Sequence, residues 1–472
     1  MSTRTYQDAI VHLNSLQSNA ATLEAVRASG GRLSEFAIPE MVEYLQRIGY
    51  EPEDLNKLDV LHVTGTKGKG STCAFIDSIL RHVKPEWKIG FFFEVWDRLE
   101  KNDKRQFPST SAKPMYFRYV TLVAFHAFLT LKVNATVLEV GVGGAYDSTN
   151  IVPRPIVTGV SALGIDHTAV LGKTLEEIAW QKGGIYKEGV PALTVDQPKE
   201  GLEKCFSSDS QASEFIVVPS IPDLNGVKLG LAGGHQVQNA TLAVYMAKKF
   251  LQVQGVKPQE IEIYIKALEN AKWPGRCQTV PDPDHPGTTW FLDGAHTTES
   301  IECCMEWFVS PSAALRLTPN GQRPLRVLIF NCTHGRSGSR FLGTMLAKAA
   351  NQLTHHQSGE EWFRLFDHVI FCANVTYADG EFKGDLTNVA IPETDLVQLK
   401  TQQELAIAWS NLVPSFSSEN IHVLPSIEHA VKIVRSLESD VDEARGVDVL
   451  VAGSLHLVGG IIEVSGLASV AL

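Results

Sequence analysis

Residues 65–72 read GTKGKGST and follow, after Thr64, the apolar run Leu58–Val63 (LDVLHV). A helical pattern then extends from about residue 71 to residue 83. A strand, a glycine-rich loop and a helix in this order form the element that binds phosphate groups in many α/β proteins. The stretch therefore predicts a sheet with parallel strands, and a nucleotide at the end of one of them.

Each residue type in the loop suits that task. Glycines let the backbone turn tightly and point its N–H groups at phosphate oxygens, and the following helix adds its positive N-terminal dipole. Lys69 is expected on the β and γ phosphates of ATP, and Ser71 or Thr72 on Mg²⁺. Gly70 separates Lys69 from Ser71, so the strict Walker spacing is not met. The nucleotide contacts predicted here are Gly65, Thr66, Gly68, Lys69, Gly70 and Ser71.

Composition limits the classes of protein to consider. The chain has 472 residues, which favours two domains, and its formal net charge of -11 argues against a nucleic-acid surface. Seven scattered cysteines without a CxxC pair indicate reduced thiols. The apolar C-terminus, from Val447 onward, is interrupted by glycines, His456 and Glu463, so it predicts a buried strand and no membrane span.

Strand and helix patterns alternate along the chain. This alternation predicts a mostly parallel sheet covered on both faces, followed by a smaller Rossmann-like α/β domain. We place the boundary in the Pro- and Asp-rich segment Val280–Thr289, interpreted as a linker or a long turn, which gives domains 1–285 and 286–472. The principal strands are expected at residues 58–63, 135–140, 156–161, 191–195, 290–292, 326–330, 368–371, 421–424 and 447–451. The principal helices are expected at residues 71–83, 116–131, 174–181, 235–253 and 258–271.

Two polar residues follow predicted strands of the first domain. Glu139 ends the strand of LEVGVGGAYDSTN, where open α/β sheets place ligands, and could hold a metal that bridges ATP and substrate. The other interpretation is a strand-end carboxylate that caps a helix. His167 in GIDHT could be a metal ligand oriented by Asp166, although a structural histidine is the commoner case.

Further candidates come later in the chain. Lys182, in AWQKGGI, has apolar neighbours that would lower its pKa and make it reactive towards CO₂ or a carbonyl; alternatively it is a solvated lysine at a helix end. Arg276 in WPGR could reach a phosphate. Asp293 in DGAH could accept hydrogen bonds from a ribose, or simply cap a helix.

In order along the chain, the motifs GTKGKGST, LEVGVGGAYDSTN, GIDHT, AWQKGGI, WPGR, DGAH and GSLHLVGG together resemble the folylpolyglutamate synthases of the Mur-ligase superfamily. The spacing of Lys69 matches the loop variant of that superfamily. The resemblance runs from about Tyr6 to the C-terminus. It implies an ATP-dependent ligase that phosphorylates the γ-carboxylate of a reduced folate and joins the acyl phosphate to L-glutamate.

The resemblance also implies roles for single residues. Ser71, Glu139 and His167 match magnesium ligands, and Lys182 matches a lysine that is carbamylated in the family. Asn239, Arg276 and Asp293 match nucleotide contacts, and His296 is a looser candidate for the interdomain cleft. The cofactors implied are ATP and Mg²⁺, with room for a monovalent cation.

One departure from the family concerns the substrate side. The expected strand Lys88–Phe92 leads directly into Phe93–Asp97, which has a helical pattern. A Ser-Pro-His loop that supplies a magnesium ligand and shapes the folate pocket in the family has no counterpart there. This departure makes an inactive nucleotide-binding variant one alternative. A second alternative is a dihydrofolate synthase on the same scaffold. No GxGxxG motif supports a dinucleotide-dependent oxidoreductase.

The same reasoning yields expectations about partners and location. We expect small-molecule substrates, no nucleic acid, no membrane span and a monomer. The N-terminus MSTRTYQDAI lacks an apolar signal-like run. A cytoplasmic enzyme with room for a mitochondrial form is the expectation.

Overall fold

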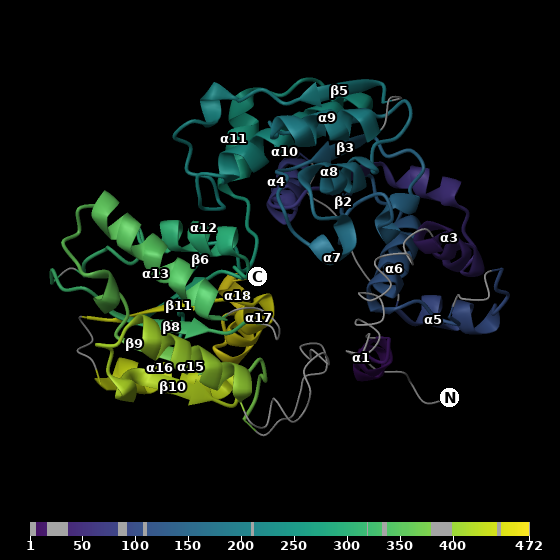
Figure 1. The fold of residues 1–472 in the computed structure, drawn as a ribbon. Coiled ribbons are helices and arrows are strands. Elements are labelled where there is room, and N and C mark those ends of the chain that lie inside the picture. The colour runs from purple at the N-terminus through teal and green to yellow at the C-terminus, as the bar shows by residue number, and fades with distance from the viewer. Residues whose placement is uncertain are drawn as a thin grey trace. The chain divides into compact units, whose positions relative to one another are not determined.

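The computed structural model describes residues 6–16, 36–83, 92–106, 111–208, 212–318, 320–332, 338–378, 399–440 and 445–471. The chain forms two compact units (Figure 1). The first comprises Met1–Gly230 and Gly234–Lys272, and the second Leu231–Gly233 and Trp273–Leu472. Each unit is built on its own sheet, so the predicted α/β class with two successive domains is confirmed.

The sheet of the first unit has five parallel strands in the order β2-β1-β3-β4-β5. Their bounds are β1 Val60–Thr64, β2 Thr136–Glu139, β3 Val157–Val160, β4 Pro191–Thr194 and β5 Glu214–Val217. Because all five run in the same direction, their carboxyl ends lie at one edge of the sheet. This edge receives the loop at residues 65–68 and the residues that follow β2 and β3.

Helices surround this sheet (Figure 1). They are α1 Tyr6–Asn14, α3 Ala37–Arg47, α4 Lys69–Val83, α5 Phe92–Lys101, α6 Tyr116–Leu131, α7 Thr168–Leu171, α8 Leu175–Gly183, α9 Lys199–Ser208, α10 Gln236–Val253 and α11 Ile261–Glu269. Helices α4 and α10 pack against each other, α4 on β1 and β2 and α10 on β3 and β4. The bounds of α6 are those expected, since Tyr119, Leu122 and Phe125 recur at helical spacing and are fully buried.

The sheet of the second unit has the order β10-β9-β8-β11-β7-β6, and all of its pairs except β6–β7 are parallel. The bounds are β6 Gln278–Pro281, β7 Thr288–Leu292, β8 Leu325–Phe330, β9 His368–Cys372, β10 Ile421–Leu424 and β11 Val447–Ala452. The helices are α12 Thr298–Phe308, α13 Gly338–His355, α15 Lys400–Leu412, α16 Ile427–Asp440, α17 Leu455–Val464 and α18 Ala468–Ala471.

Alternation along these strands divides the apolar side chains between two cores. Phe291 contributes to the core under α12, α13 and α15, whereas its neighbours Trp290 and Leu292 contribute to the core under α16 and α17. Strands buried on both faces read as continuous apolar runs. This is why β8 and β11 are recognisable in the sequence.

The segment Val280–Thr289 is a hairpin, so of its two interpretations the long turn agrees with the structure and the linker does not. Strand β6 pairs antiparallel with β7. In the turn, the carboxylate of Asp282 accepts hydrogen bonds from the backbone N–H of His285 (3.0 Å) and from the indole of Trp290 (2.8 Å). The proline and aspartates thus build a turn inside the second unit, and the expected boundary at residue 285 lies within that unit.

The region of the departure from the family is described only in part. Residues 84–91, which include most of the expected strand Lys88–Phe92, lie outside the described residues. Helix α5 begins at Phe92, so the helical pattern expected at Phe93–Asp97 is confirmed.

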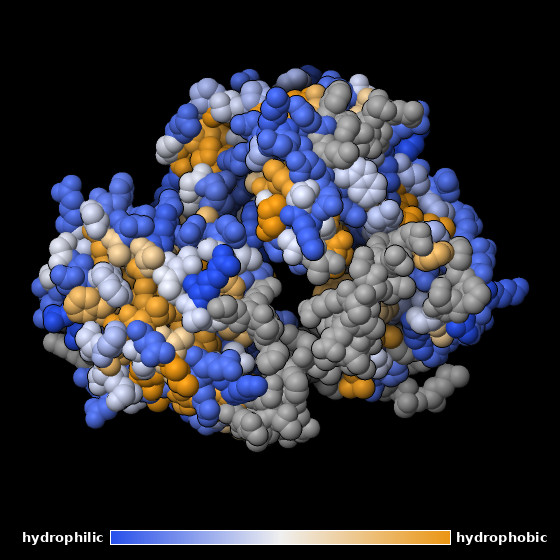
Figure 2. All heavy atoms as spheres, in the orientation of Figure 1, coloured by the Kyte–Doolittle hydropathy of each residue, from blue (hydrophilic) through white to orange (hydrophobic). Residues whose placement is uncertain are grey.

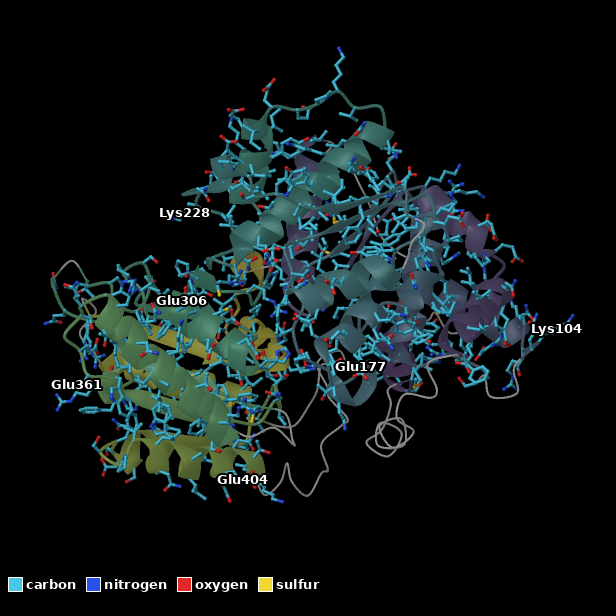
Figure 3. The ribbon with its side chains drawn as sticks, turned by 45° about the horizontal axis from the view of Figure 1, so that its top comes forward. Lys104, Glu177, Lys228, Glu306, Glu361 and Glu404 are labelled. Carbon is cyan, nitrogen blue, oxygen red and sulfur yellow. The ribbon has the colours of Figure 1, made fainter. Side chains whose placement is uncertain are left out.

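The surface carries charged and apolar groups together. Hydrophilic and hydrophobic residues both appear on the visible face (Figure 2). Exposed charged side chains such as Lys104, Glu177 and Glu404 extend outward from the two units (Figure 3). Among the helices of the described residues, none combines the length and apolarity needed to span a membrane.

Candidate active site

The glycine-rich loop is fastened to the end of the neighbouring strand β3. The backbone N–H groups of Thr66 and Lys67 donate to the carbonyl of Ala162 (2.9 and 3.1 Å). The hydroxyl of Ser161 donates to the carbonyl of Lys67 (2.7 Å), and that of Thr66 to the carbonyl of Gly164 (3.0 Å). The loop conformation is therefore held by contacts nearly a hundred residues away, and Ser161 is a supporting residue that the sequence pattern did not single out.

Gly68 is required by both conformation and space. Its φ of +85° lies in the left-handed region, and a Cβ at this position would overlap the side-chain amide of Asn239. Asn239 is buried in the first turn of α10, where its Nδ2 donates to Oε1 of Gln236 (2.9 Å). The structure thus brings Asn239 against the loop, although 171 positions separate it from Gly68 in the chain.

Two lysine side chains converge on one backbone carbonyl. Nζ of Lys69 and Nζ of Lys182 both donate to the carbonyl oxygen of Gly65, at 3.1 and 2.8 Å. Only 2% of Lys182 is exposed. Burial lowers the pKa of Lys69, and the charge of Glu139 opposes that shift. Positive charge held in a poorly solvated place beside backbone N–H groups suits a polyphosphate.

The buried position of Lys182 follows from how its helix ends. Helix α8 starts with a capping box between Thr174 and Glu177, and its last turn docks on the loop after β2. There the N–H of Ala145 donates to the carbonyl of Gln181 (2.7 Å), and Nδ2 of Asn150 donates to the carbonyl of Gly184 (2.9 Å). Asn150 is a second supporting residue that sequence reasoning missed, although its motif DSTN was part of the pattern.

The expected metal ligands lie around the same edge. Glu139 is the last residue of β2, pairs in register with Val63 just before the loop, and is exposed. Ser71 is buried in the first turn of α4. Carboxylate and hydroxyl oxygens are ligands that suit Mg²⁺. In the described parts of the chain, no three His, Cys, Asp or Glu side chains are grouped as a protein-only metal site.

His167 stands at the start of α7 with its side chain exposed and its backbone φ at +50°. Its N–H donates to the carboxylate of Asp166 (2.8 Å), and that carboxylate forms an ion pair with Lys67 (3.5 Å). Partial burial lowers the pKa of His167, as do the charges of Lys182 and Lys69, while Asp166 opposes them. The imidazole is thereby kept neutral, which a metal ligand requires.

A second group of predicted residues lies in the other unit. The N–H of Gly294 donates to the carbonyl of Gly275 (2.9 Å), which brings the motifs WPGR and DGAH together. Asp293 follows β7, and Oδ1 accepts from the N–H of Ala295 while Oδ2 accepts from the N–H of Cys277, both at 2.7 Å. Burial raises the pKa of Asp293, and these bonds and the charge of Arg276 counteract the rise.

His296 is held by its own loop. Its Nδ1 lies 2.7 Å from the carbonyl of Gly294, and its backbone N–H donates to the hydroxyl of Ser300 (3.1 Å). The predicted residues therefore form two sets. Lys69, Lys182, Glu139, His167 and Asn239 belong to the first unit, and Arg276, Asp293 and His296 to the second.

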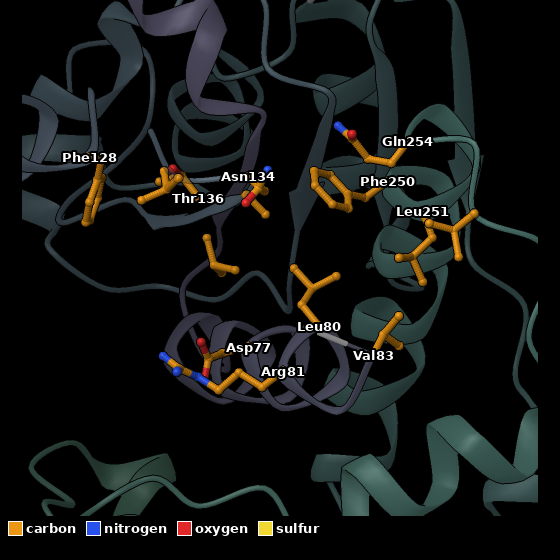
Figure 4. A pocket seen from close by; sticks show the side chains of 14 residues that line it. Asp77, Leu80, Arg81, Val83, Phe128, Asn134, Thr136, Phe250, Leu251 and Gln254 are labelled. Carbon is orange, nitrogen blue, oxygen red and sulfur yellow. The ribbon is translucent and has the colours of Figure 1, made fainter. Parts of the chain in front are cut away.

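An apolar pocket of about 250 Å³ lies elsewhere in the first unit and contains none of the predicted residues. Its walls come from the ends of α4 and α10 and from residues 133–137 at the amino end of β2. Leu80, Val83, Phe250 and Leu251 face it, with Asp77 and Arg81 side by side on α4 (Figure 4). Strands place their ligands at carboxyl ends, so this pocket is at the wrong edge for the nucleotide.

Comparison with known proteins gives consistent relatives, although no protein-family model matches the chain. It is 38% identical to the folylpolyglutamate synthases of Saccharomyces cerevisiae strains FostersO and AWRI796, over 98% of this chain and 87% of theirs. These alignments extend over 505 positions, more than the 472 residues of the chain. They therefore include positions of the yeast proteins that have no counterpart here.

Solved structures share the fold. A Mycobacterium tuberculosis folylpolyglutamate synthase complexed with ADP matches with a TM-score of 0.64 and 17% identity, covering 97% of this chain and 98% of that one. The folylpolyglutamate synthase of Thermotoga maritima matches with a TM-score of 0.60 and 20% identity, covering 92% and 94%. The two-unit architecture is thus common to all three chains.

Proposed function

Because this chain belongs to the folylpolyglutamate synthase family, we propose that it is an ATP-dependent ligase acting on folates. It adds L-glutamate to the γ-carboxylate of tetrahydrofolate and of its polyglutamates. The observation that carries the proposal is the pair of side-chain nitrogens of Lys69 and Lys182 on the carbonyl of Gly65, beside a loop that has room only for glycine at residue 68.

The loop would bind the phosphates of ATP. The loop residues Gly65, Thr66 and Gly68 and the first turn of α4, with Gly70 and Ser71, would surround these phosphates. Lys69 neutralises charge on the β and γ phosphates. Phosphoryl transfer depends on positioning and on charge neutralisation, and the folate γ-carboxylate attacks the γ phosphorus to give an acyl phosphate and ADP.

The expected metal fits the donor chemistry at this edge. Ser71 and Glu139 offer oxygens and His167 offers a neutral nitrogen, with a monovalent cation as a further candidate. When bound, Mg²⁺ would supply positive charge next to the transferring phosphoryl group. Lys182 is buried, and its unprotonated amine could add to CO₂ and release a proton, which would leave a carbamate as one more oxygen ligand.

The second unit would complete the nucleotide and amine side of the reaction. Arg276 would contact a phosphate, Asp293 would accept from a ribose hydroxyl, and Asn239 would contact the nucleotide from the first unit. His296 would serve the step in which the amine of glutamate attacks the acyl phosphate. The ATP-binding role therefore falls mainly to the first unit and the glutamate-ligase role to the second.

Product analysis tests this function. The purified chain is incubated with MgATP, L-glutamate and either tetrahydrofolate or dihydropteroate, and products are identified by mass spectrometry. Glutamate addition to tetrahydrofolate is the expected result. Turnover of dihydropteroate alone would contradict it and identify a dihydrofolate synthase. A chain that binds ATP but makes neither product would be an inactive variant, as the missing Ser-Pro-His loop allows.

The remaining expectations extend this proposal. The substrates are a reduced folate and L-glutamate, with no nucleic acid among the partners. We place the enzyme in the cytoplasm, with a mitochondrial form as an extension, and propose that it acts as a monomer. Light scattering of the purified chain would check its oligomeric state.

A further inference from the structure

The residue that follows WPGR in the chain contacts the carboxylate of Asp293 twice. The backbone N–H of Cys277 donates to Oδ2 of Asp293 (2.7 Å), and Sγ of Cys277 donates to the same oxygen (3.1 Å). Oδ1 accepts from the N–H of Ala295 (2.7 Å). Only 8% of Cys277 and 6% of Asp293 are exposed, so water does not replace these bonds easily.

The bonds leave the two oxygens of Asp293 unequal. A carboxylate oxygen accepts about two hydrogen bonds. Oδ2 has both positions filled by Cys277, whereas Oδ1 has one filled by Ala295. The remaining acceptor position on Oδ1 is the one that a ligand hydroxyl could use. The thiol therefore determines which oxygen is presented.

The thiol is suited to donate, and the backbone is bent to allow it. Burial raises the pKa of Cys277 well above its ordinary value of 9.0, so the group stays protonated at neutral pH. Its φ of +45° lies in the left-handed region, which non-glycine residues seldom adopt. Cys277 therefore keeps an uncommon backbone conformation at the position where its N–H and its thiol both donate to Asp293.

We propose that Cys277 is a positioning residue that orients the carboxylate of Asp293 for the nucleotide. This inference rests on the proposed contact between Asp293 and ATP. Cys277 acts through Asp293 and touches no reacting atom itself.

The charged and titratable neighbours of Asp293 define the pH dependence to expect. Arg276 is the cation whose charge stabilises the ionised carboxylate, and Cys303 and Cys304 approach from α12 with pKa values raised by burial. The Cys277 thiol also stabilises the ionised form. Removing this donor raises the pKa of Asp293, so ATP binding should weaken at the acid end of the pH range first.

Calorimetric titration with ATP tests the inference on the full chain, whether or not it turns over substrate. Cys277→Ala should raise the Kd for ATP about tenfold at pH 7, the effect of one hydrogen bond to a charged group. The loss should grow at pH 6. Cys277→Ser keeps a donor and should bind ATP within about twofold of the wild type. Cys372→Ala removes a buried thiol from the other core of the second unit and should leave the Kd unchanged.

Two results would overturn the inference. Cys277→Ala with an unchanged Kd would do so, and so would Cys277→Ser that binds as weakly as Cys277→Ala. The serine variant keeps the test decisive if the alanine variant does not fold.

Asp293→Asn separates this inference from the proposed function. If Asp293→Asn weakens ATP binding and Cys277→Ala does not, only the role of Cys277 fails. If Asp293→Asn has no effect, the contact between Asp293 and ATP fails as well.

Discussion

The two units differ in the candidate groups that follow their parallel strands. In the first unit, the side-chain nitrogens of Lys69 and Lys182 donate to the carbonyl of Gly65. In the second, Asp293 is a buried carboxylate held by donors of Cys277 and Ala295. A lysine nitrogen suits a phosphate, whereas a carboxylate suits a hydroxyl or an amine. One α/β plan therefore supplies donors in one unit and an acceptor in the other.

The largest effect should come from removing the side chain of Lys69 in the first unit. Lys69→Ala should lower ATP-dependent turnover at least about a hundredfold, because a charge aimed at the transferring phosphoryl group is lost. Release of ADP is the measurement. Lys57→Ala removes an exposed lysine that pairs with Asp54, and should retain the wild-type rate. A Lys69→Ala enzyme with unimpaired turnover would refute the assignment of the loop.

A methyl group placed in the loop should have the next largest effect. Gly68→Ala combines left-handed backbone with overlap against Asn239, and should weaken ATP binding by about tenfold or more. Gly189→Ala is the matched control, because its φ of +71° is similar and nothing lies within 4 Å of the new Cβ. Both variants carry about 1 kcal/mol of backbone strain. Equal Kd values for ATP in the two variants would mean that the contact with Asn239 is irrelevant.

Variants at Lys182 test whether this buried side chain acts as an amine or, after reaction with CO₂, as a carbamate. Lys182→Ala should reduce turnover about tenfold or more, and added short carboxylic acids should restore part of it by replacing the carbamate oxygens. Depletion of CO₂ should slow the wild-type enzyme as well. Lys173→Ala, an exposed lysine just before α8, serves as the control. Full activity of the wild type without CO₂ would exclude the carbamate.

The last prediction concerns stability and a second buried carboxylate of the second unit, Asp448. Burial raises the pKa of Asp448 to about 6, although Arg316 pairs with it at 2.6 Å. Asp448 therefore binds its proton more tightly in the folded chain than in the unfolded chain. The resulting stabilisation is full below about pH 4 and is lost as the pH rises through 6.

Asp448→Asn should remove this pH dependence. Between pH 4 and pH 7, the free energy of unfolding of the wild type should fall by about 2 to 3 kcal/mol relative to that of the variant. Urea unfolding at the two pH values measures the difference. Parallel pH profiles for the two proteins would show that Asp448 titrates alike in the folded and unfolded chains.

Prediction from sequence succeeded where the pattern is local. The order β1, glycine loop and α4, and the bounds of α6, follow from apolar periodicity and glycine placement. The segment at residues 280–289 stayed open between a linker and a long turn, because proline and aspartate are common in both. What distinguishes it is the pair of hydrogen bonds from His285 and Trp290 to Asp282, which requires the fold.

The sequence patterns identified the candidate site residues one by one. They did not identify the residues that these contact in the fold. The bond from Lys182 to the carbonyl of Gly65 joins residues 117 positions apart, and periodicity carries no information about such pairings. The same holds for Asn239 against Gly68 and for the support given by Ser161 and Asn150. Cys277 has only its place after WPGR as a signal, and its role depends on a backbone φ that the sequence does not reveal.

One experiment addresses the central claim, that the loop at residues 65–72 serves a folate ligase. ATP binding to the purified chain is measured by calorimetry, and ADP release is then followed in the same sample as L-glutamate and tetrahydrofolate are added in turn. We expect ATP binding, and ADP release that requires both substrates. Normal ATP binding with no ADP release when both are present would contradict it.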